Sequence, residues 1–433
     1  MNWIEQGCRS AGEEGEGLTA TPGRQKVRRY AIGTLLDKMT FGAICLFIFF
    51  LSIPHMTTIR LVLYGFAVVC GTVAIVKQRG QYPGLSIPFL PLMMFFCLWM
   101  LLGAVLSRNV GNSIHDLWVF WVKYVLLYVL MANFIREKRR IKICGWGVAG
   151  AGTLIAGDLL WQHFVVKEQG VMVKLVSDFS EMPVNWVGFF LCFSFAVTLT
   201  LLLRKRWGKG LLLFVPPLFL MGMTAFVTQS RATIFAFGSV GTYLLFRRNK
   251  MMGLVCVVCG VAALAVNPVV TRLNYTNIAQ SDRHATLLVA LEIWKENPVL
   301  GIGIGGANYT SLELDRYREK IPPELRSYPV LGDPHSLPLN LLVRTGVVGL
   351  VLFGILVFCV VWNLIQTIRR SGEDAYYKEW GDCFLISLFA VLLIATFEPT
   401  GNTLFAGAFF VLLGFITALF QTKRTAVVVA VIE

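Results

Sequence analysis

The chain has 433 residues, of which 56% are hydrophobic and only 15% are charged, and its formal net charge is +14. Soluble globular domains carry about 25% charged residues, so this composition excludes an ordinary soluble protein. The positive charge requires no nucleic acid partner, because basic loops at a membrane surface meet anionic lipid headgroups. We therefore expect an all-α polytopic membrane protein.

Apolar runs recur along the chain at the length that crosses a hydrocarbon core, about 20 residues each. The tenth run is long enough to be tilted or to begin above the membrane. Residues 1–29 contain no stretch of the signal-peptide type and are expected to form a disordered cytoplasmic tail. The sequence predicts about twelve transmembrane helices, with approximate ends at 40–54, 57–76, 86–106, 117–135, 143–164, 184–203, 210–228, 232–246, 251–269, 337–367, 382–397 and 402–421.

Basic residues fix the predicted orientation of these helices. Of the 39 Lys and Arg residues, 25 lie in the two terminal tails and in every second loop. Because basic loops stay on the cytoplasmic side, both termini are expected to be cytoplasmic. The chain then divides into helices one to nine (30–269), a periplasmic loop (270–336), helices ten to twelve (337–424) and a C-terminal tail (425–433).

The polar segment 270–336 is the one long interruption of the apolar pattern, and it carries seven basic and eight acidic residues. Asp282 begins a predicted helix that ends near Pro298. On that helix Arg283 shares a stripe with Leu287, Leu291 and Trp294, so we expect Arg283 to point inward, toward the membrane domain. The pattern from Thr310 to Glu313 resembles a capping box and predicts a second helix, to about Lys320.

The glycine-rich run 301–306 has the spacing G-x-G-x-x-G, but it follows a helix end and Pro298 rather than a strand. A dinucleotide site needs a βαβ unit around this motif, so we reject that interpretation. We predict instead a flexible connection whose backbone approaches another surface closely. None of the ten cysteines lies in the polar segment, and Cys256 and Cys259 are predicted to be buried thiols within an apolar helix.

Two further residues at the outer boundary are candidates for chemistry. Arg231 lies in a short turn between the runs 210–228 and 232–246, where an arginine either reaches headgroups or contacts a phosphate or carboxylate. Ser230 is well placed to cap the helix that follows. His335 follows Asp333-Pro334 at the start of the tenth run, and Asp333 or a backbone carbonyl is expected to orient its imidazole. Other boundary charges, to which we assign no role, are Arg60, Lys123, Arg344 and Glu398.

From Gln229 to Leu350 the sequence resembles the bacterial O-antigen ligase family, which includes related polymerases and protein O-oligosaccharyltransferases. The resemblance rests on the Ser230-Arg231-Ala232 turn, on Arg283 followed by the glycine-rich run, on Pro334-His335, and on Gly346-Val-Val-Gly-Leu350. The twelve-span layout extends it across most of the chain. The sequence departs from the family pattern in one place, because an asparagine commonly follows the histidine and Ser336 stands here.

The resemblance implies transfer of a glycan from an undecaprenyl diphosphate carrier to lipid A–core at the periplasmic face of the inner membrane. By the same resemblance His335 is the catalytic histidine, and Arg231 and Arg283 bind the donor diphosphate. The outer segments contain no Asp/Glu cluster of the kind that binds metals, so we expect no metal and no cofactor. Direct displacement would invert the anomeric centre.

Three alternatives remain open at this point. A polymerase of O-antigen or exopolysaccharide would use the same donor with a different acceptor, and a protein glycosylating enzyme is a more distant variant. A transporter or flippase also suits twelve spans. The missing internal repeat and the lack of acidic residues in mid-span argue against transport.

Overall fold

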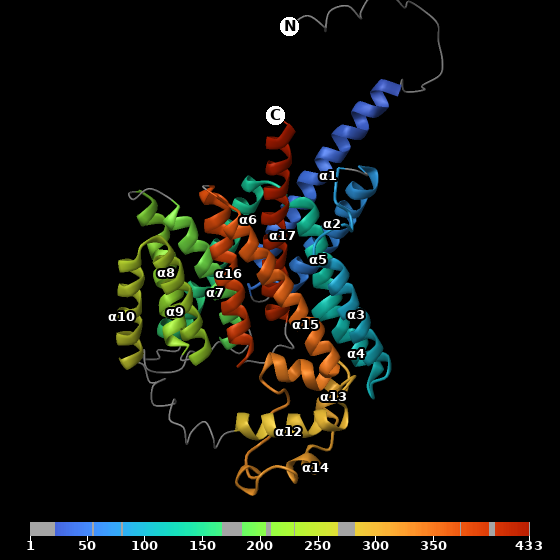
Figure 1. Cartoon of the computed structure of the whole chain (residues 1–433), viewed down its shortest axis with the longest axis vertical. Coiled ribbons are helices and arrows are strands. Elements are labelled where there is room, and N and C mark those ends of the chain that lie inside the picture. The colour runs from blue at the N-terminus through green and yellow to red at the C-terminus, as the bar shows by residue number, and fades with distance from the viewer. Residues whose placement is uncertain are drawn as a thin grey trace, which may run out of the picture.

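The computed structural model describes residues 22–53, 56–78, 81–166, 184–204, 209–228, 230–266, 282–372, 374–397 and 403–432, and every regular element in them is a helix (Figure 1). The predicted tail up to residue 21, the first part of the polar segment (270–281) and Glu398 lie outside the described residues. Each predicted apolar run overlaps at least one described helix. The helices are α1 (Pro22–Phe50), α2 (Thr57–Lys77), α3 (Leu90–Val105), α4 (Val110–Leu117), η1 (Trp118–Val122), α5 (Lys123–Phe134), α6 (Lys138–Trp161), η2 (Gln162–Val166), α7 (Val184–Leu203), α8 (Lys209–Val227), α9 (Arg231–Arg248), α10 (Lys250–Val266), α15 (Leu337–Arg369), α16 (Ala375–Ala395) and α17 (Thr403–Ile432).

Length and composition qualify only some of these helices as membrane spans. Six described stretches are long and apolar enough: Gly33–Phe50, Thr57–Lys77, Val110–Phe134, Lys138–Val166, Leu337–Arg369 and Phe405–Arg424. Four shorter apolar helices accompany them, at Leu90–Val105, Val187–Leu203, Leu212–Val227 and Lys250–Ala262. Helices α9 and α16 carry charged residues in or near their end turns. The chain is thus a helical membrane protein, and the count of twelve spans stays a prediction.

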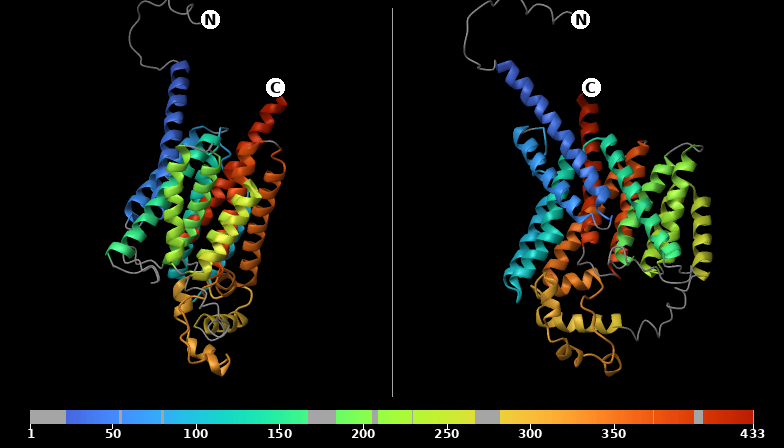
Figure 2. Two further views of the ribbon diagram at one scale, coloured as in Figure 1. Left: turned by 90° about the vertical axis from the view of Figure 1, so that its left-hand side faces the viewer. Right: turned by 180° about the vertical axis from the view of Figure 1, so that it is seen from behind.

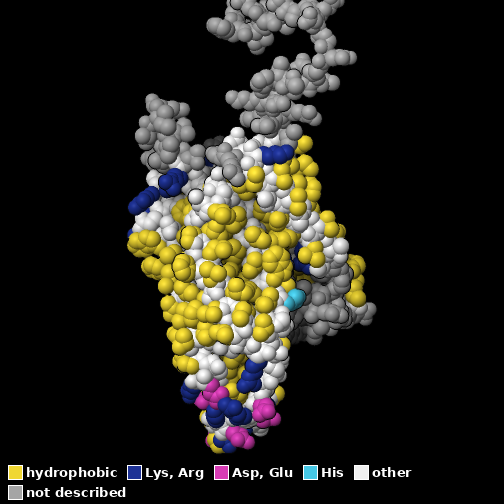
Figure 3. Space-filling model, turned by 90° about the vertical axis from the view of Figure 1, so that its right-hand side faces the viewer, with side chains coloured by type: hydrophobic (Ala, Val, Ile, Leu, Met, Phe, Trp, Pro, Cys, Tyr) yellow, Lys and Arg dark blue, Asp and Glu magenta, His cyan; other side chains and the backbone are white. Residues whose placement is uncertain are grey.

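Helix α17 lies inside the bundle, and every residue from Phe405 to Leu419 is buried. Many outward side chains of the surrounding helices are apolar and exposed, among them Val69, Phe95, Phe219 and Phe358, each more than 60% exposed. Figure 3 shows a broad yellow surface over the middle of one face, with charged side chains gathered at its two ends. A surface of this kind suits contact with lipid, because exposing such a large apolar area to water is unfavourable.

Ion pairs join neighbouring helices at one end of the bundle. Arg247 of α9 pairs with Asp382 of α16 at 2.9 Å, and Arg204, just past α7, pairs with Glu379 of α16 at 2.9 Å. Lys138, at the start of α6, pairs with Asp374, the N-cap of α16, at 2.9 Å. The described part of α1 begins at this end and α17 ends there, while the segment 282–336 lies at the opposite end (Figures 1 and 2).

The segment 282–336, which we call the lid, has its own hydrophobic core. It contains α12 (Asp282–Glu296), α13 (Gly306–Thr310), α14 (Leu314–Arg318) and the short η4 (Pro323–Leu325). Residues of α12 and of the loops around it pack against Leu339 and Val343 of α15, and the buried set also contains Ala285, Val289, Ala290, Ile293, Tyr309, Tyr317, Ile321 and Leu325. The first predicted lid helix is confirmed. The second is wrong in extent, because α14 has five residues and Thr310 belongs to α13.

Polar contacts fasten the lid to α4. Asn308 accepts a hydrogen bond from the Asn109 N–H at 2.9 Å and donates one to Ser113 Oγ at 2.7 Å. The carboxylate of Asp116 accepts from the Gly306 N–H at 2.9 Å. Asn308 is 1% exposed, so its amide would carry a desolvation penalty without these partners.

Helix α15 contains a break at Gly346, where φ is 66° and ψ is −175°, and residues 298–303, which we call the glycine strap, fill the break. The Ile302 and Gly303 N–H groups donate to the carbonyls of Val343 and Arg344, at 2.9 and 3.1 Å. The Val347 N–H in turn donates to the Pro298 carbonyl at 2.9 Å. The strap thus satisfies the backbone groups that the break releases, and the predicted close approach of the glycine backbone is confirmed.

Candidate active site

His335 lies where the lid meets α15, in a backbone conformation that few residues other than glycine adopt. Its φ is 50°, while Ser336, the N-cap of α15, is extended. A left-handed conformation costs a residue with a side chain about 1–2 kcal/mol. Strained backbone of this kind is common at functional sites, where surrounding contacts maintain it.

The carboxylate of Asp333 accepts hydrogen bonds from three sides. The His335 backbone N–H donates to Oδ1 at 3.1 Å. The side-chain amide of Asn340 donates to Oδ1 at 3.1 Å and to Oδ2 at 2.9 Å. Arg344 Nη2 forms an ion pair with Oδ2 at 2.9 Å. Asp333 therefore orients the turn around His335 and makes no bond to the imidazole itself, contrary to the simplest form of our expectation.

Arg344 is the buried member of this arrangement. Its residue is 7% exposed, and its Nη1 donates to the Ile304 carbonyl at 3.1 Å. Burial of an arginine inside a protein at membrane depth is expensive unless a counter-charge is near. Asp333 supplies that counter-charge, which identifies the partner that Arg344 needs.

The imidazole of His335 is half-buried, and its Nδ1 has no hydrogen-bond partner among the described residues. Burial lowers the pKa of His335 below its ordinary 6.5; the carboxylate of Asp333 raises that pKa, and the positive charge of Arg283 lowers it. The folded chain therefore keeps His335 neutral at pH 7, the form that accepts a proton.

Arg283 lies in the first turn of α12, near enough to His335 for its charge to act on the imidazole. Its predicted inward orientation is wrong, because the side chain is exposed and Leu287 on the same stripe is 40% exposed. The buried face of α12 is instead formed by Ala285, Thr286, Val289, Ala290 and Ile293. Small residues on that face let α12 lie close to the lid core, and Arg283 remains at the edge of the face.

Arg231 is the first residue of α9 and is half-buried. The predicted cap is confirmed, since Ser230 Oγ accepts from the Thr233 N–H at 3.4 Å. Within the described part of the chain we see no contact that joins Arg231 to His335 or Arg283. The assignment of Arg231, Arg283 and His335 to one site stays a prediction, supported for Arg283 and His335 by the effect of the arginine charge on the imidazole.

The comparison with protein families bears on this same region, since the O-antigen ligase family model matches residues 216–354. These residues belong to the O-antigen ligase family. The resemblance noted in the sequence is thereby confirmed over α9, the lid and the start of α15, a stretch that contains Arg231, Arg283 and His335. A search of curated proteins finds no match to the chain.

Membership of this family implies a ligase or polymerase activity on lipid-linked polysaccharide. Within the described residues no group of three or more His, Cys, Asp and Glu side chains is arranged to hold a metal ion. The described part of residues 216–354, which we call the ligase-family segment, offers the imidazole of His335, the charge of Arg283 and the buried Asp333–Arg344 pair.

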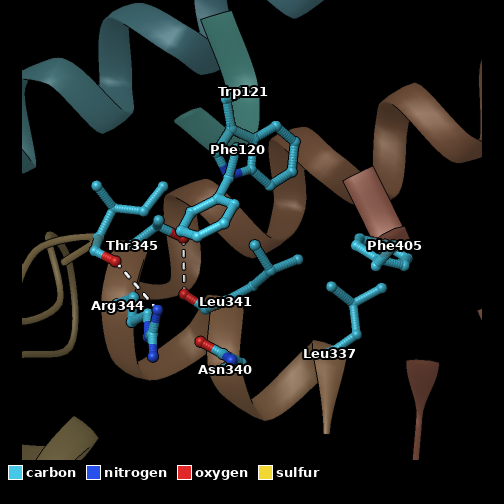
Figure 4. A pocket seen from close by; sticks show the side chains of 9 residues that line it. Phe120, Trp121, Leu337, Asn340, Leu341, Arg344, Thr345 and Phe405 are labelled. Atoms are coloured by element: carbon cyan, nitrogen blue, oxygen red, sulfur yellow. Dashed lines mark hydrogen bonds between the residues drawn. The ribbon is translucent and has the colours of Figure 1, made fainter. Parts of the chain in front are cut away.

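A cavity of about 30 Å³ adjoins Arg344, enough room for about two water molecules. Figure 4 shows Phe120 and Trp121 across the cavity from side chains of α15, with Phe405 at one end. Phe120 and Trp121 belong to the π-helix η1, a form often found at functional sites. The remaining lining residues are Ile304, Leu337, Asn340, Leu341, Arg344 and Thr345.

Two residues of the site, Asn340 and Arg344, received no role from the sequence. They lie four residues apart, so they share one face of α15 at the end nearest the lid. An asparagine and an arginine at that spacing in an apolar helix were the available signal. Their common partner, Asp333, lies before the first residue of α15, so helical periodicity alone does not predict the contact.

Proposed function

We propose that this protein is a glycosyltransferase that moves a surface polysaccharide from an undecaprenyl diphosphate carrier to a sugar hydroxyl of lipid A–core. The observation that carries the proposal is His335, half-buried in a left-handed turn where the lid meets α15, within the residues that match the ligase family. A neutral imidazole beside an arginine suits a reaction that removes a proton at one point and releases a phosphate anion at another.

In the proposed reaction an oxygen of the acceptor hydroxyl attacks the anomeric carbon of the carrier-linked sugar. A new C–O bond forms, the bond from the anomeric carbon to the diphosphate oxygen breaks, and its electron pair leaves with the diphosphate. The hydroxyl proton passes to His335, which acts as general base. Direct displacement inverts the anomeric configuration, so retention in the product would exclude this mechanism.

Arg283 and Arg231 are assigned to the diphosphate. Charge builds up on the leaving diphosphate as the glycosidic bond breaks, and guanidinium groups stabilise such charge through paired, charge-assisted hydrogen bonds. The exposed position of Arg283 on the lid supports this role, because a charge there can meet a lipid headgroup at the membrane boundary. Arg231, at the outer end of α9, is proposed to complete the site when donor is bound.

The proposed arrangement in the cell follows from the two ends of the bundle. The start of α1, the end of α17 and the inter-helix ion pairs mark one end, which we assign to the cytoplasm, and the lid marks the other, which we assign to the periplasm. The donor would then reach the site from the outer leaflet of the inner membrane. Membrane lipids are the other expected partners, and no nucleic acid is expected.

Purified protein in detergent tests the proposal with undecaprenyl diphosphate-linked glycan and lipid A–core as substrates. His335→Ala should abolish transfer, while Arg231→Ala and Arg283→Ala should raise the donor KM and reduce kcat by about 10²-fold or more. His115→Ala is the matched histidine control, because His115 has a side chain that is 68% exposed and lies on α4. Arg318→Ala, in an exposed pair with Asp315, is the arginine control.

The outcomes separate the proposed ligase from its relatives. Extension of the donor glycan with no transfer to lipid A–core would identify a polymerase instead. Transfer in detergent, without a membrane gradient, excludes a transporter. Full activity of His335→Ala would remove the catalytic assignment.

A further inference from the structure

We propose that Asp333 and Arg344 are positioning residues that hold His335 in its reactive orientation, an inference that rests on the proposed function. Neither residue contacts the imidazole. Their effect passes through the backbone of His335 and through the start of α15.

The first step is the strain at His335. A histidine at φ 50° relaxes to ordinary backbone unless other contacts hold it. The hydrogen bond from its N–H to Asp333 Oδ1, at 3.1 Å, closes a short turn around Pro334. Aspartate closes such turns well because its side chain accepts from the backbone two residues further on.

The second step is that Asp333 is itself held in place. The amide of Asn340 contacts both carboxylate oxygens, and Arg344 binds Oδ2 at 2.9 Å. Asn340 and Arg344 are 4% and 7% exposed, so either polar side chain would lose its partner at a cost if it turned away from the carboxylate. A carboxylate with donors on both oxygens has one rotamer, and the turn that depends on it has one conformation.

The third step ties this arrangement to the lid. Arg344 Nη1 donates to the Ile304 carbonyl at 3.1 Å, and the Arg344 carbonyl accepts from the Gly303 N–H at 3.1 Å. Both partners belong to the lid, and the contact is possible because α15 breaks at Gly346. The histidine turn is therefore fixed only while the lid is seated on α15.

An ion pair is not the cheapest way to fill a buried position, since apolar residues of similar size often stabilise a protein as well or better. The pair instead fixes geometry, because the planar guanidinium of Arg344 binds the Ile304 carbonyl and the Asp333 carboxylate at the same time and at fixed angles. Loss of this fixed geometry should reduce kcat for transfer more than it weakens binding of the donor.

The test compares Asp333→Asn, Arg344→Gln, Arg344→Lys and the double variant Asp333→Asn/Arg344→Gln in the purified transfer assay. We expect Asp333→Asn and Arg344→Gln to lower kcat by about tenfold or more with donor KM changed less than about threefold. Arg344→Lys, which keeps the charge and loses the fork, should fall between wild type and Arg344→Gln. Asp315→Asn is the matched control, because Asp315 is an 88% exposed lid carboxylate paired with Arg318.

The pH profile of kcat provides a readout that simple loosening of the fold would move in the opposite direction, because exposure of the imidazole to water raises its pKa. The charges that act at this site come from Asp333, from Arg283 on α12, and from Arg344, whose charge also reaches Tyr309 of α13. Asp333→Asn removes the carboxylate that raises the pKa of His335, so the acid limb should move to lower pH. Asp315→Asn should leave the limb in place.

Thermal unfolding is measured for every variant. If the Tm of a single variant falls, its kinetics are replaced by those of Asp333→Asn/Arg344→Gln, which removes both charges and leaves no unpaired charge buried. The positioning role would be overturned if Asp333→Asn and Arg344→Gln kept the wild-type kcat and pH profile while His335→Ala was inactive. That result would leave the proposed function intact. Activity in His335→Ala would instead overturn the proposed function.

Discussion

The backbone of Gly346 lies so close to Val299 that a Cβ atom on Gly346 would be 1.9 Å from the Val299 carbonyl oxygen. Val299 belongs to the glycine strap, and Gly346 is the point at which α15 breaks. The contact therefore requires glycine twice over, because φ there is 66° and no space exists for a side chain. The seating of the lid on α15 depends on this position.

Gly346→Ala should accordingly displace the strap and disturb the histidine turn. A side chain in this backbone conformation, which essentially only glycine adopts, costs about 1–3 kcal/mol, and the clash with Val299 adds to it. We expect a lower Tm in detergent and at least about a tenfold loss of transfer, since site geometry is sensitive to small shifts. Gly354→Ala in the same helix meets nothing within 4 Å and should leave both measurements unchanged. Equal behaviour of the two variants would contradict the role of the strap.

The acid limb of the transfer rate should report the pKa of His335. Burial and the charge of Arg283 hold that pKa below 6.5, so the base form persists as pH falls to 6.5, and activity is lost only at lower pH. Arg283→Gln removes one cause of the lowering and should move the limb to higher pH, in addition to its effect on the donor KM. Arg318→Gln, a lid arginine in an exposed pair, should not move it. A limb at or above 6.5 in the wild type would contradict the burial of a neutral imidazole.

The helices of the bundle were predictable because apolar runs of membrane length leave few alternatives. Inside the lid the sequence was less informative. Arg283 falls on an apolar stripe by periodicity, yet the packed face is the neighbouring one with Ala285, Val289 and Ile293. Both faces of α12 carry apolar residues, so the sequence of α12 alone does not show which face is packed. The choice depends on the surface of α15 against which α12 lies.

The candidate site divides in the same way. His335 and Arg283 were proposed from the sequence, and the charge of Arg283 acts on the imidazole in the structure. The contacts of Arg344 with Asp333 and with the Ile304 carbonyl were not predicted. They join a residue of α15 to two lid residues, one before the helix start and one directly after the glycine strap. Gly346 and its neighbours read as an ordinary apolar helix in the sequence, so the break that creates these contacts had no local signal.

Glu296 joins two parts of the lid and should confer resistance to acid. Arg316, Lys320 and Tyr317 all donate to its carboxylate, which lowers its pKa from 4.5 to about 2. Since the folded pKa is depressed, this stabilisation is fully present above pH 4.5 and is lost as the pH falls toward 2.

Glu296→Gln should therefore speed hydrogen exchange in the C-terminal turn of α12 and in 316–320 by about two- to fivefold at pH 7, a modest effect because the cluster is at the surface. The difference from wild type should shrink as the pH approaches 3. Glu292→Gln is the control, since Glu292 pairs with Lys295 on the same helix, at 2.5 Å. An exchange rate that is unchanged at pH 7 would show that the cluster does not hold the lid.

The sidedness of the bundle follows from basic residues and is open to direct labelling. In a background without native cysteines, Glu324→Cys places a thiol on an exposed part of the lid, and Lys142→Cys places one on an exposed part of α6 near its start. We expect a membrane-impermeant maleimide to label the lid cysteine in cells with a permeabilised outer membrane. The α6 cysteine should react only after the inner membrane is opened, because basic loops stay in the cytoplasm. The reverse pattern would invert the topology and place His335 where no periplasmic acceptor reaches it. Transfer activity of both variants, measured alongside, shows that each labelled protein is folded.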